Sequence, residues 1–139
     1  MERPWDSNNK YTHLVLKEYK YWSLELSNRQ RTLGAFYIFS RRDHERFSEM
    51  TKEEMEELLV VMHEMESALA RAFHPDRFNY LQLGNELHRL HFHGYPRYAT
   101  ARICGGRTWI DETFTSWPSS SRDRTPPEVL LDVQKQIKV

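Results

Sequence analysis

Three of the chain's seven histidines fall within six residues, at His88, His91 and His93 of the segment LHRLHFH. Residues two apart in a β-strand project to the same face of the sheet. His91 and His93 therefore share a face. Arg89 joins them if the strand is regular, whereas His88 has the opposite parity and points away unless a bulge intervenes.

A row of this kind is suited to phosphate chemistry. A neutral imidazole is a good nucleophile near neutral pH, since its unperturbed pKa is about 6.5. It can attack phosphorus and form a covalent phosphoramidate, which divides one displacement into two steps. A second imidazole on the same face, with a guanidinium such as that of Arg89, would stabilise the charge that develops on the phosphate oxygens.

Two other interpretations of the same residues stay open. Most zinc sites need three or four ligands. A metal site on His91 and His93 would therefore need a third ligand from His88, which has the wrong parity, or from a histidine or acid elsewhere. The histidines could also be incidental members of a solvated strand face.

The hydrophobic pattern predicts that these residues sit in an α+β domain with a mostly antiparallel sheet. Thr51 and Glu54 form a capping box that opens one long helix with a single apolar face. Thr125 and Pro126 are placed to open a short C-terminal helix. The nearly continuous apolar run 32–40 is expected to be the central strand. Other strand-like runs are a hairpin or bent strand at 12–27 and the segments 78–83, 87–93 and 98–104, with a turn at 94–96 between the last two.

Composition limits the classes of function. The 20 basic residues balance the 20 acidic ones, so there is no basic excess for a nucleic-acid polymer as partner. Cys104 is the single cysteine, which fits a reducing, cytoplasmic setting. We find no signal peptide and no apolar run that would span a membrane. We expect a loose N-terminal arm over residues 1–10 and one domain over residues 11–139.

Several segments resemble the histidine triad (HIT) family of nucleotidyl hydrolases and transferases. LGNELHRLHFHGYPRY resembles the family signature His-φ-His-φ-His-φ-φ, where φ is an apolar residue. Upstream, SNRQRTLGAFYIFSRRDH, SEMTKEEMEELLVVM and HPDRFNYLQLGN are similar to the family's ribose-side loop and central strand, its long helix, and the strand that leads to the phosphate loop. The resemblance covers about Leu16 to Tyr98, with the segments in order.

The resemblance implies a HIT-like domain of about five strands, one long helix and a short C-terminal helix, assembled as a homodimer. It implies chemistry at the α-phosphate of nucleotidyl substrates such as dinucleoside polyphosphates or nucleotide phosphoramidates, with no metal or other cofactor. His91 matches the nucleophile and His93 a histidine that contacts the phosphate. His44 matches a supporting histidine. The positions that match ribose or phosphate contacts are Asn79, Gly84 and Asn85, with Gln30 or Asn28 near the ribose edge.

The chain departs from the family signature at its first position, where Arg89 replaces a histidine. The backbone carbonyl there can still hold the nucleophile's other ring nitrogen, but the side-chain relay toward His44 is lost. Arg89 could instead pair with Asp43 or Glu86, or contact phosphate. The alternative functions are therefore a nucleotide-binding protein with little catalysis and, in a third class, a metal enzyme that uses the clustered histidines.

Overall fold

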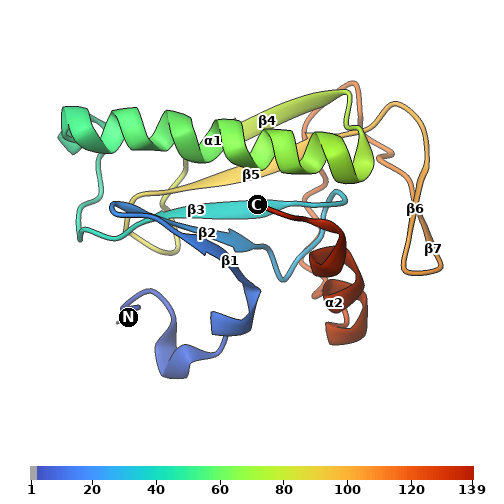
Figure 1. Cartoon of the computed structure of the whole chain (residues 1–139), viewed down its shortest axis with the longest axis horizontal. Helices are drawn as coiled ribbons and strands as arrows, with labels where there is room; N and C mark the ends of the chain where they lie inside the picture. The colour runs from blue at the N-terminus through green and yellow to red at the C-terminus, as the bar shows by residue number, and fades with distance from the viewer. Residues whose placement is uncertain (1–2) are drawn as a thin grey trace.

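The computed structural model describes residues 3–139. A five-stranded sheet forms its centre, in the order β1-β2-β3-β5-β4, and every neighbouring pair is antiparallel. Figure 1 shows the strands in this order, with the long helix lying across the sheet. The strands of this sheet are β1 (Val15–Glu18), β2 (Trp22–Leu26), β3 (Phe36–Ser40), β4 (Arg77–Leu81) and β5 (His91–Arg97).

Two helices and a small hairpin complete the fold. Helix α1 (Lys52–Phe73) begins at the expected capping box, where the Thr51 hydroxyl accepts from the Glu54 amide. It ends at His74, which adopts a left-handed conformation before Pro75. The α+β prediction, with one long helix and a short C-terminal helix, α2 (Pro127–Gln136), is confirmed. β6 (Arg102–Cys104) and β7 (Arg107–Trp109) form a separate two-stranded sheet.

The two faces of the large sheet have different chemistry. Cross-strand pairing puts Leu24, Ile38 and Phe92 in one row, and these side chains are at most 4 % exposed in the core with α1 and α2. The neighbouring row on the opposite face is Ser23, Phe39 and His91. Because side chains alternate along a strand, burying the apolar row presents the histidine row on the other face.

β5 differs from the sequence prediction. A strand was expected over residues 87–93 and a turn over 94–96, but β5 begins at His91 and continues to Arg97. Gly94 pairs directly with Phe36, and a Cβ there would lie 2.1 Å from the Phe36 ring. The glycine therefore makes room for a ring within the sheet. Pro96 lies beyond the last β3 pair, where a residue without an N–H is tolerated.

The N-terminal segment also differs from expectation. Met1 and Glu2 lie outside the described residues. Arg3, Trp5 and Asp6 pack on the sheet instead of forming a loose arm, whereas residues 7–10 are exposed. Arg3 is 6 % exposed and its Nη1 lies 2.7 Å from Glu25 Oε2 of β2. Asp6 is also buried, and its carboxylate accepts from the Tyr11 amide. Polar residues that look unattached in sequence are thus paired in space. No helix within residues 3–139 combines the length and apolar character needed to cross a membrane.

Candidate functional site

A pocket of about 460 Å³ opens on the histidine face of the sheet. Its walls come from β2, β3 and β5, from the loop before β5, and from residues near both chain ends. His91 and His93 both line it, as their shared parity predicts. The polar residues of its wall are Asp6, Glu25, Asn28, Arg29, Arg31, Asn85, Glu86 and Arg122.

His91 is held in one tautomer by a hydrogen bond to the backbone of Arg89. The ring is 6 % exposed and Nδ1 lies 2.7 Å from the carbonyl oxygen of Arg89. A carbonyl can only accept, so Nδ1 carries the proton and donates it. In the neutral ring Nε2 therefore keeps its lone pair, which is the requirement for a nucleophile. The carbonyl contact survives the replacement of histidine by arginine because it uses only the backbone of Arg89.

His93 is kept neutral. Burial, followed by repulsion from Arg31 and from His91 whenever that ring is protonated, lowers the pKa of His93 to about 4, although Glu86 acts in the opposite direction. Its ring centroid lies 5.0 Å from that of His91. At neutral pH the imidazole therefore has one N–H to donate and adds no positive charge beside the nucleophile.

Three arginines supply the positive charge of the pocket. The Arg31 Nε donates to the Ser121 carbonyl at 2.7 Å, and Arg122 pairs with Glu86 at 3.1 Å across exposed surface. Arg29 has no ion pair to any residue from 3 to 139, and its buried Nε has no hydrogen-bond partner there. Arg29 thus brings to the pocket a positive charge that no carboxylate of residues 3–139 neutralises.

The predicted ligand contacts divide into two sets. Asn28, Gly84 and Asn85 line the pocket with the two histidines. Gln30 does not: its Nε2 donates to the Ser27 and Ala35 carbonyls, and its Oε1 accepts from the Gly34 amide. The side chain of Gln30 thus braces the turn between β2 and β3, and of the two candidates for the ribose edge Asn28 is the one that faces the pocket.

Asn79 also lies outside the pocket lining. It projects from β4, and its Oδ1 accepts from Arg97 Nη1 at 2.8 Å. Arg97 is 1 % exposed and also forms an ion pair with Asp111, with 2.7 Å between Nε and Oδ2. Asn79 is therefore one of the hydrogen-bond acceptors around the buried Arg97 guanidinium.

Arg89 is not among the residues that line the pocket. Its Nη1 lies 3.3 Å from the Ser40 carbonyl and its Nη2 3.8 Å from Asp43, which is one of the two partners expected. The other, Glu86, pairs with Arg122 instead. The Arg89 guanidinium also lies 5.3 Å from the centre of the Trp5 ring. Arg89 is thus held by β3 and the N-terminal segment.

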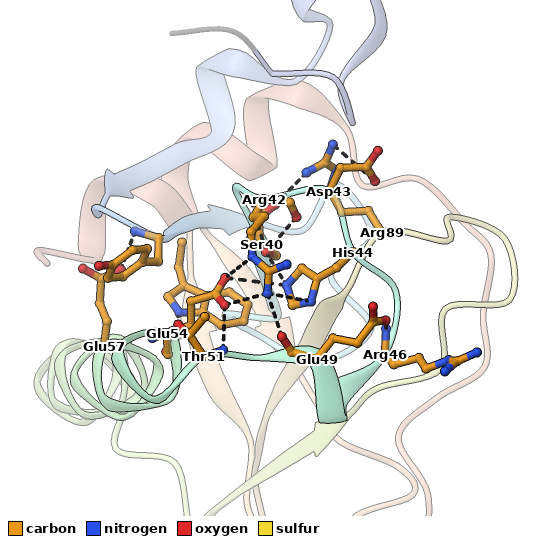
Figure 2. Close-up of polar contacts among 12 residues, drawn as sticks. Ser40, Arg42, Asp43, His44, Arg46, Glu49, Thr51, Glu54, Glu57 and Arg89 are labelled. Atoms are coloured by element: carbon orange, nitrogen blue, oxygen red, sulfur yellow. Dashed lines mark hydrogen bonds and ion pairs between the residues drawn. The ribbon is translucent and has the colours of Figure 1, made fainter.

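His44 is the centre of a buried network behind the site (Figure 2). Its Nδ1 lies 3.3 Å from Arg42 Nη2, which can only donate, so the proton is on Nε2 and faces Ser40 Oγ at 3.0 Å. Burial and the neighbouring Arg42 lower the pKa of His44. Arg42 also forms a two-pronged ion pair with Glu54, at 2.8 and 3.2 Å.

This network is linked to His91 through the backbone. The Leu90 amide donates to the His44 carbonyl at 2.7 Å, and the Ser40 amide donates to the Leu90 carbonyl at 3.0 Å. Leu90 immediately precedes His91. His44 therefore supports the position of His91 through main-chain contacts, although its side chain forms no hydrogen bond or ion pair with the Arg89 side chain.

The described residues contain no cluster of side chains that could bind a metal ion. Between residues 3 and 139 no group of three or more His, Cys, Asp or Glu side chains could hold a metal ion. His88 is exposed and is not among the residues that line the pocket. The third histidine needed for a metal site is thus not brought to the pair His91 and His93.

Sequence reasoning missed several residues of the pocket. Tyr37 and Phe39 pair directly with His93 and His91 across the sheet, and the alternation within the apolar strand would have identified them. Trp5, Arg29 and Arg122 carry no comparable signal, because they reach the pocket from loops and from the N-terminal segment.

Comparisons with known proteins agree on the fold. The family model described as HIT domain matches residues 8–100. A hypothetical histidine triad nucleotide-binding protein from Sulfolobus tokodaii strain 7 has a TM-score of 0.68 at 17 % identity, over 88 % of this chain and 79 % of that one. A HIT-like protein from Bartonella henselae, described as involved in cell-cycle regulation and solved with an unknown ligand, has a TM-score of 0.67 at 15 % identity, over 90 % and 84 %.

A histidine triad protein from Marinobacter aquaeolei VT8 has a TM-score of 0.63 at 20 % identity, over 94 % of this chain and 90 % of that one. At such identities the likeness shows the fold alone. A search of curated proteins found no match. The match of the family model over more than half of the 139 residues confirms the resemblance found in the sequence.

Proposed function

The chain belongs to the HIT domain family, and from this premise we propose that it is a nucleotidyl hydrolase or transferase that acts at the α-phosphate of nucleotidyl substrates. The observation that carries the proposal is the state of His91. Its Nδ1–H is donated to the Arg89 carbonyl at 2.7 Å, and its ring borders the pocket. That arrangement leaves Nε2 as an unprotonated nitrogen available to phosphorus.

The proposed reaction has two steps. His91 Nε2 attacks the α-phosphorus, an N–P bond forms, and the bond to the leaving group breaks, with the leaving group taking up a proton. Water then cleaves the N–P bond and releases the nucleoside monophosphate, or a second acceptor takes the nucleotidyl group. Neutral His93 donates its N–H to a phosphate oxygen, and alignment with charge stabilisation supplies most of the acceleration.

The remaining pocket residues suit a nucleoside phosphate. Arg29 offers an unpaired cation to the phosphates, and the loop at Gly84 and Asn85 borders the same space. Asn28 lies on the sugar side in this assignment. The aromatic rings of Tyr37 and Phe39 give the pocket an apolar wall of the kind that a nucleobase requires. Dinucleoside polyphosphates and nucleotide phosphoramidates are the two substrate classes we propose.

The proposal is tested by intact mass spectrometry of protein quenched after mixing with a panel of phosphoramidates and dinucleoside polyphosphates. We expect an adduct of one nucleotidyl group on the wild-type chain and none on His91→Asn. His91→Asn keeps a polar side chain at this position but removes the nucleophilic Nε2. It should therefore retain nucleotide affinity, measured as a rise in melting temperature. Wild-type turnover in His91→Asn would refute the mechanism.

The fixed side chain of Arg89 favours a second candidate, a nucleotide-binding protein with little catalysis. The guanidinium is engaged by the Ser40 carbonyl and Trp5 and does not line the pocket. It is therefore not placed to donate hydrogen bonds directly to a phosphate in the pocket. In this case nucleotides would raise the melting temperature of the wild-type protein, yet no member of the panel would be consumed. Robust turnover of any substrate eliminates this candidate.

We also propose that the protein is a homodimer. β4 is an edge strand of the described sheet, and the Tyr80 hydroxyl on it donates to Glu66 of α1, so the edge and the helix adjoin. α1 exposes Met55, Leu59 and Val60, with Leu59 at 69 %. Light scattering should give about twice the 16.8 kDa chain mass, and Leu59→Glu should reduce it. A wild-type mass of one chain at micromolar concentration contradicts the dimer.

A further inference from the structure

Residues 3–6 precede the family match, yet they lie on the histidine face of the sheet. Arg3 donates from Nη1 to Glu25 Oε2 at 2.7 Å and to Ser23 Oγ at 3.2 Å. The indole Nε1 of Trp5 donates to the same Glu25 oxygen at 3.0 Å. Glu25 is 3 % exposed. The Ser23 hydroxyl also donates to this oxygen, at 2.9 Å, so the carboxylate that holds the Trp5 indole is itself fixed in place.

Trp5 is the outer member of an aromatic stack that ends at the nucleophile. Its ring stacks on Phe39 with 5.7 Å between centroids and 17° between planes. Phe39 stacks on His91 at 5.3 Å and 24°. Phe39 has His91 as its pair on β5 and Ser23 as its pair on β2, where Glu25 holds Trp5. The Phe39 ring is thus held between the indole and the imidazole.

Arg89 closes these contacts into a ring. Its guanidinium lies 5.3 Å from the centre of the Trp5 ring, and its carbonyl accepts the Nδ1–H of His91. The circuit runs from His91 to Phe39, to Trp5, to Arg89 and back to His91. A single hydrogen bond leaves an imidazole free to tilt, whereas contacts on its face and at its edge fix both its plane and its rotation.

We propose that Trp5 is a positioning residue for His91, which it restrains through Phe39 and Arg89. The inference rests on the proposed function for the role of His91 in turnover. Trp5 also borders the pocket, so the competing role is that of a wall for the substrate. The two roles differ in kinetics: loss of a positioning residue lowers kcat, while loss of a wall that binds ground state and transition state equally raises KM.

The test compares four variants in steady-state kinetics with an adenosine phosphoramidate. Trp5→Leu removes the ring and should lower kcat about tenfold with KM within about twofold, since small misplacements of a reacting group carry costs of that order. Trp5→Phe keeps a ring but loses the bond to Glu25, and should lower kcat about threefold. Arg3→Met, at a residue that does not line the pocket, should lower kcat in the same direction. Trp117→Leu, at a 73 % exposed tryptophan, is the matched control.

A second readout is independent of turnover. Nitrogen NMR of the imidazoles, with the His91 signals assigned by their loss in His91→Asn, reports the tautomer and mobility of the ring. The wild type should show a single Nδ1–H tautomer, and Trp5→Leu should broaden the signals or move them toward the average of the two tautomers. Thermal unfolding checks that each variant is folded. If Trp5→Leu does not fold, Arg3→Met and Trp5→Phe test the proposal in its place.

The outcomes separate this inference from the proposed function. Positioning by Trp5 is overturned if Trp5→Leu leaves both kcat and the His91 signals unchanged, or if it raises KM alone. If the wild type consumes no substrate but Trp5→Leu disorders the His91 ring, the positioning role stands and the proposed reaction fails. If the wild type turns over substrate and Trp5→Leu matches it in both kcat and the His91 signals, the reaction stands and the positioning role fails.

Discussion

Glu54→Gln is the substitution whose energetic effect follows most directly from the structure. Glu54 is 2 % exposed and forms the two-pronged ion pair with Arg42 behind the site. Burial alone would raise its pKa, but hydrogen bonds from Arg42 and Thr51 outweigh burial and lower the pKa from 4.5 to about 2. A shift of this size makes ionisation stabilise the fold by about 3 kcal/mol at neutral pH.

The pH dependence has a defined sign. A depressed folded-state pKa gives stability that is present above the unfolded pKa and is lost as pH falls toward the folded pKa. Glutamine resembles the protonated acid, so the difference between wild type and Glu54→Gln should be about 3 kcal/mol at pH 7 and about 1 kcal/mol at pH 3. At pH 7 the melting temperature should fall by about 10 °C.

Urea unfolding at the two pH values measures this difference. The matched control is Glu53→Gln, an exposed residue of the same helical turn, which should change the free energy of unfolding by less than about 0.5 kcal/mol. A loss that is equal at pH 7 and pH 3 would show that packing, not ionisation, is the contribution of Glu54. A loss below about 1 kcal/mol at pH 7 would refute the magnitude.

Two further predictions concern His93 and Gln30. Because the pKa of His93 is lowered to about 4, the unfolded chain binds its proton more readily, so stability should rise with pH between about 4 and 6.5; His93→Phe should flatten the urea-unfolding profile there by about 2 kcal/mol. Unchanged slope in that variant would contradict the buried neutral imidazole. Gln30→Ala should lower the free energy of unfolding by about 2 kcal/mol, because it removes three buried hydrogen bonds. Its nucleotide affinity by calorimetry should stay near wild type, and a large loss of affinity would make Gln30 a direct contact.

Local patterns were sufficient for the chemistry-bearing strand and its supports. A period of two identified His91 and His93 as a pair, and the capping box identified the start of α1 at Thr51. These signals are local because strand parity and helix capping depend on residues within a few positions of one another.

The rest of the site depends on distant pairings. In the sequence Arg3 looks like part of a loose arm, because its ion-pair partner Glu25 lies 22 residues later. Gly94 looks like a turn because its partner Phe36 is far away in sequence. Nothing near residue 30 distinguishes the bracing amide of Gln30 from the pocket residue Asn28. The two residues are distinguished only in the folded turn between β2 and β3, where Gln30 bonds to the backbone and Asn28 lines the pocket.

The walls of the pocket have two different origins along the chain. The histidines and their cross-strand partners belong to the interior strands, while Trp5 and Arg122 come from segments on either side of the family match. Changes around Arg122 would alter the opening of the pocket without touching the contacts of His91, so they could change selectivity alone. Changes around Trp5 would alter both the opening and the proposed restraint on His91. Residues 8–100 contain His91 and His93 but lack Trp5 and Arg122, and thus part of the wall around the two imidazoles.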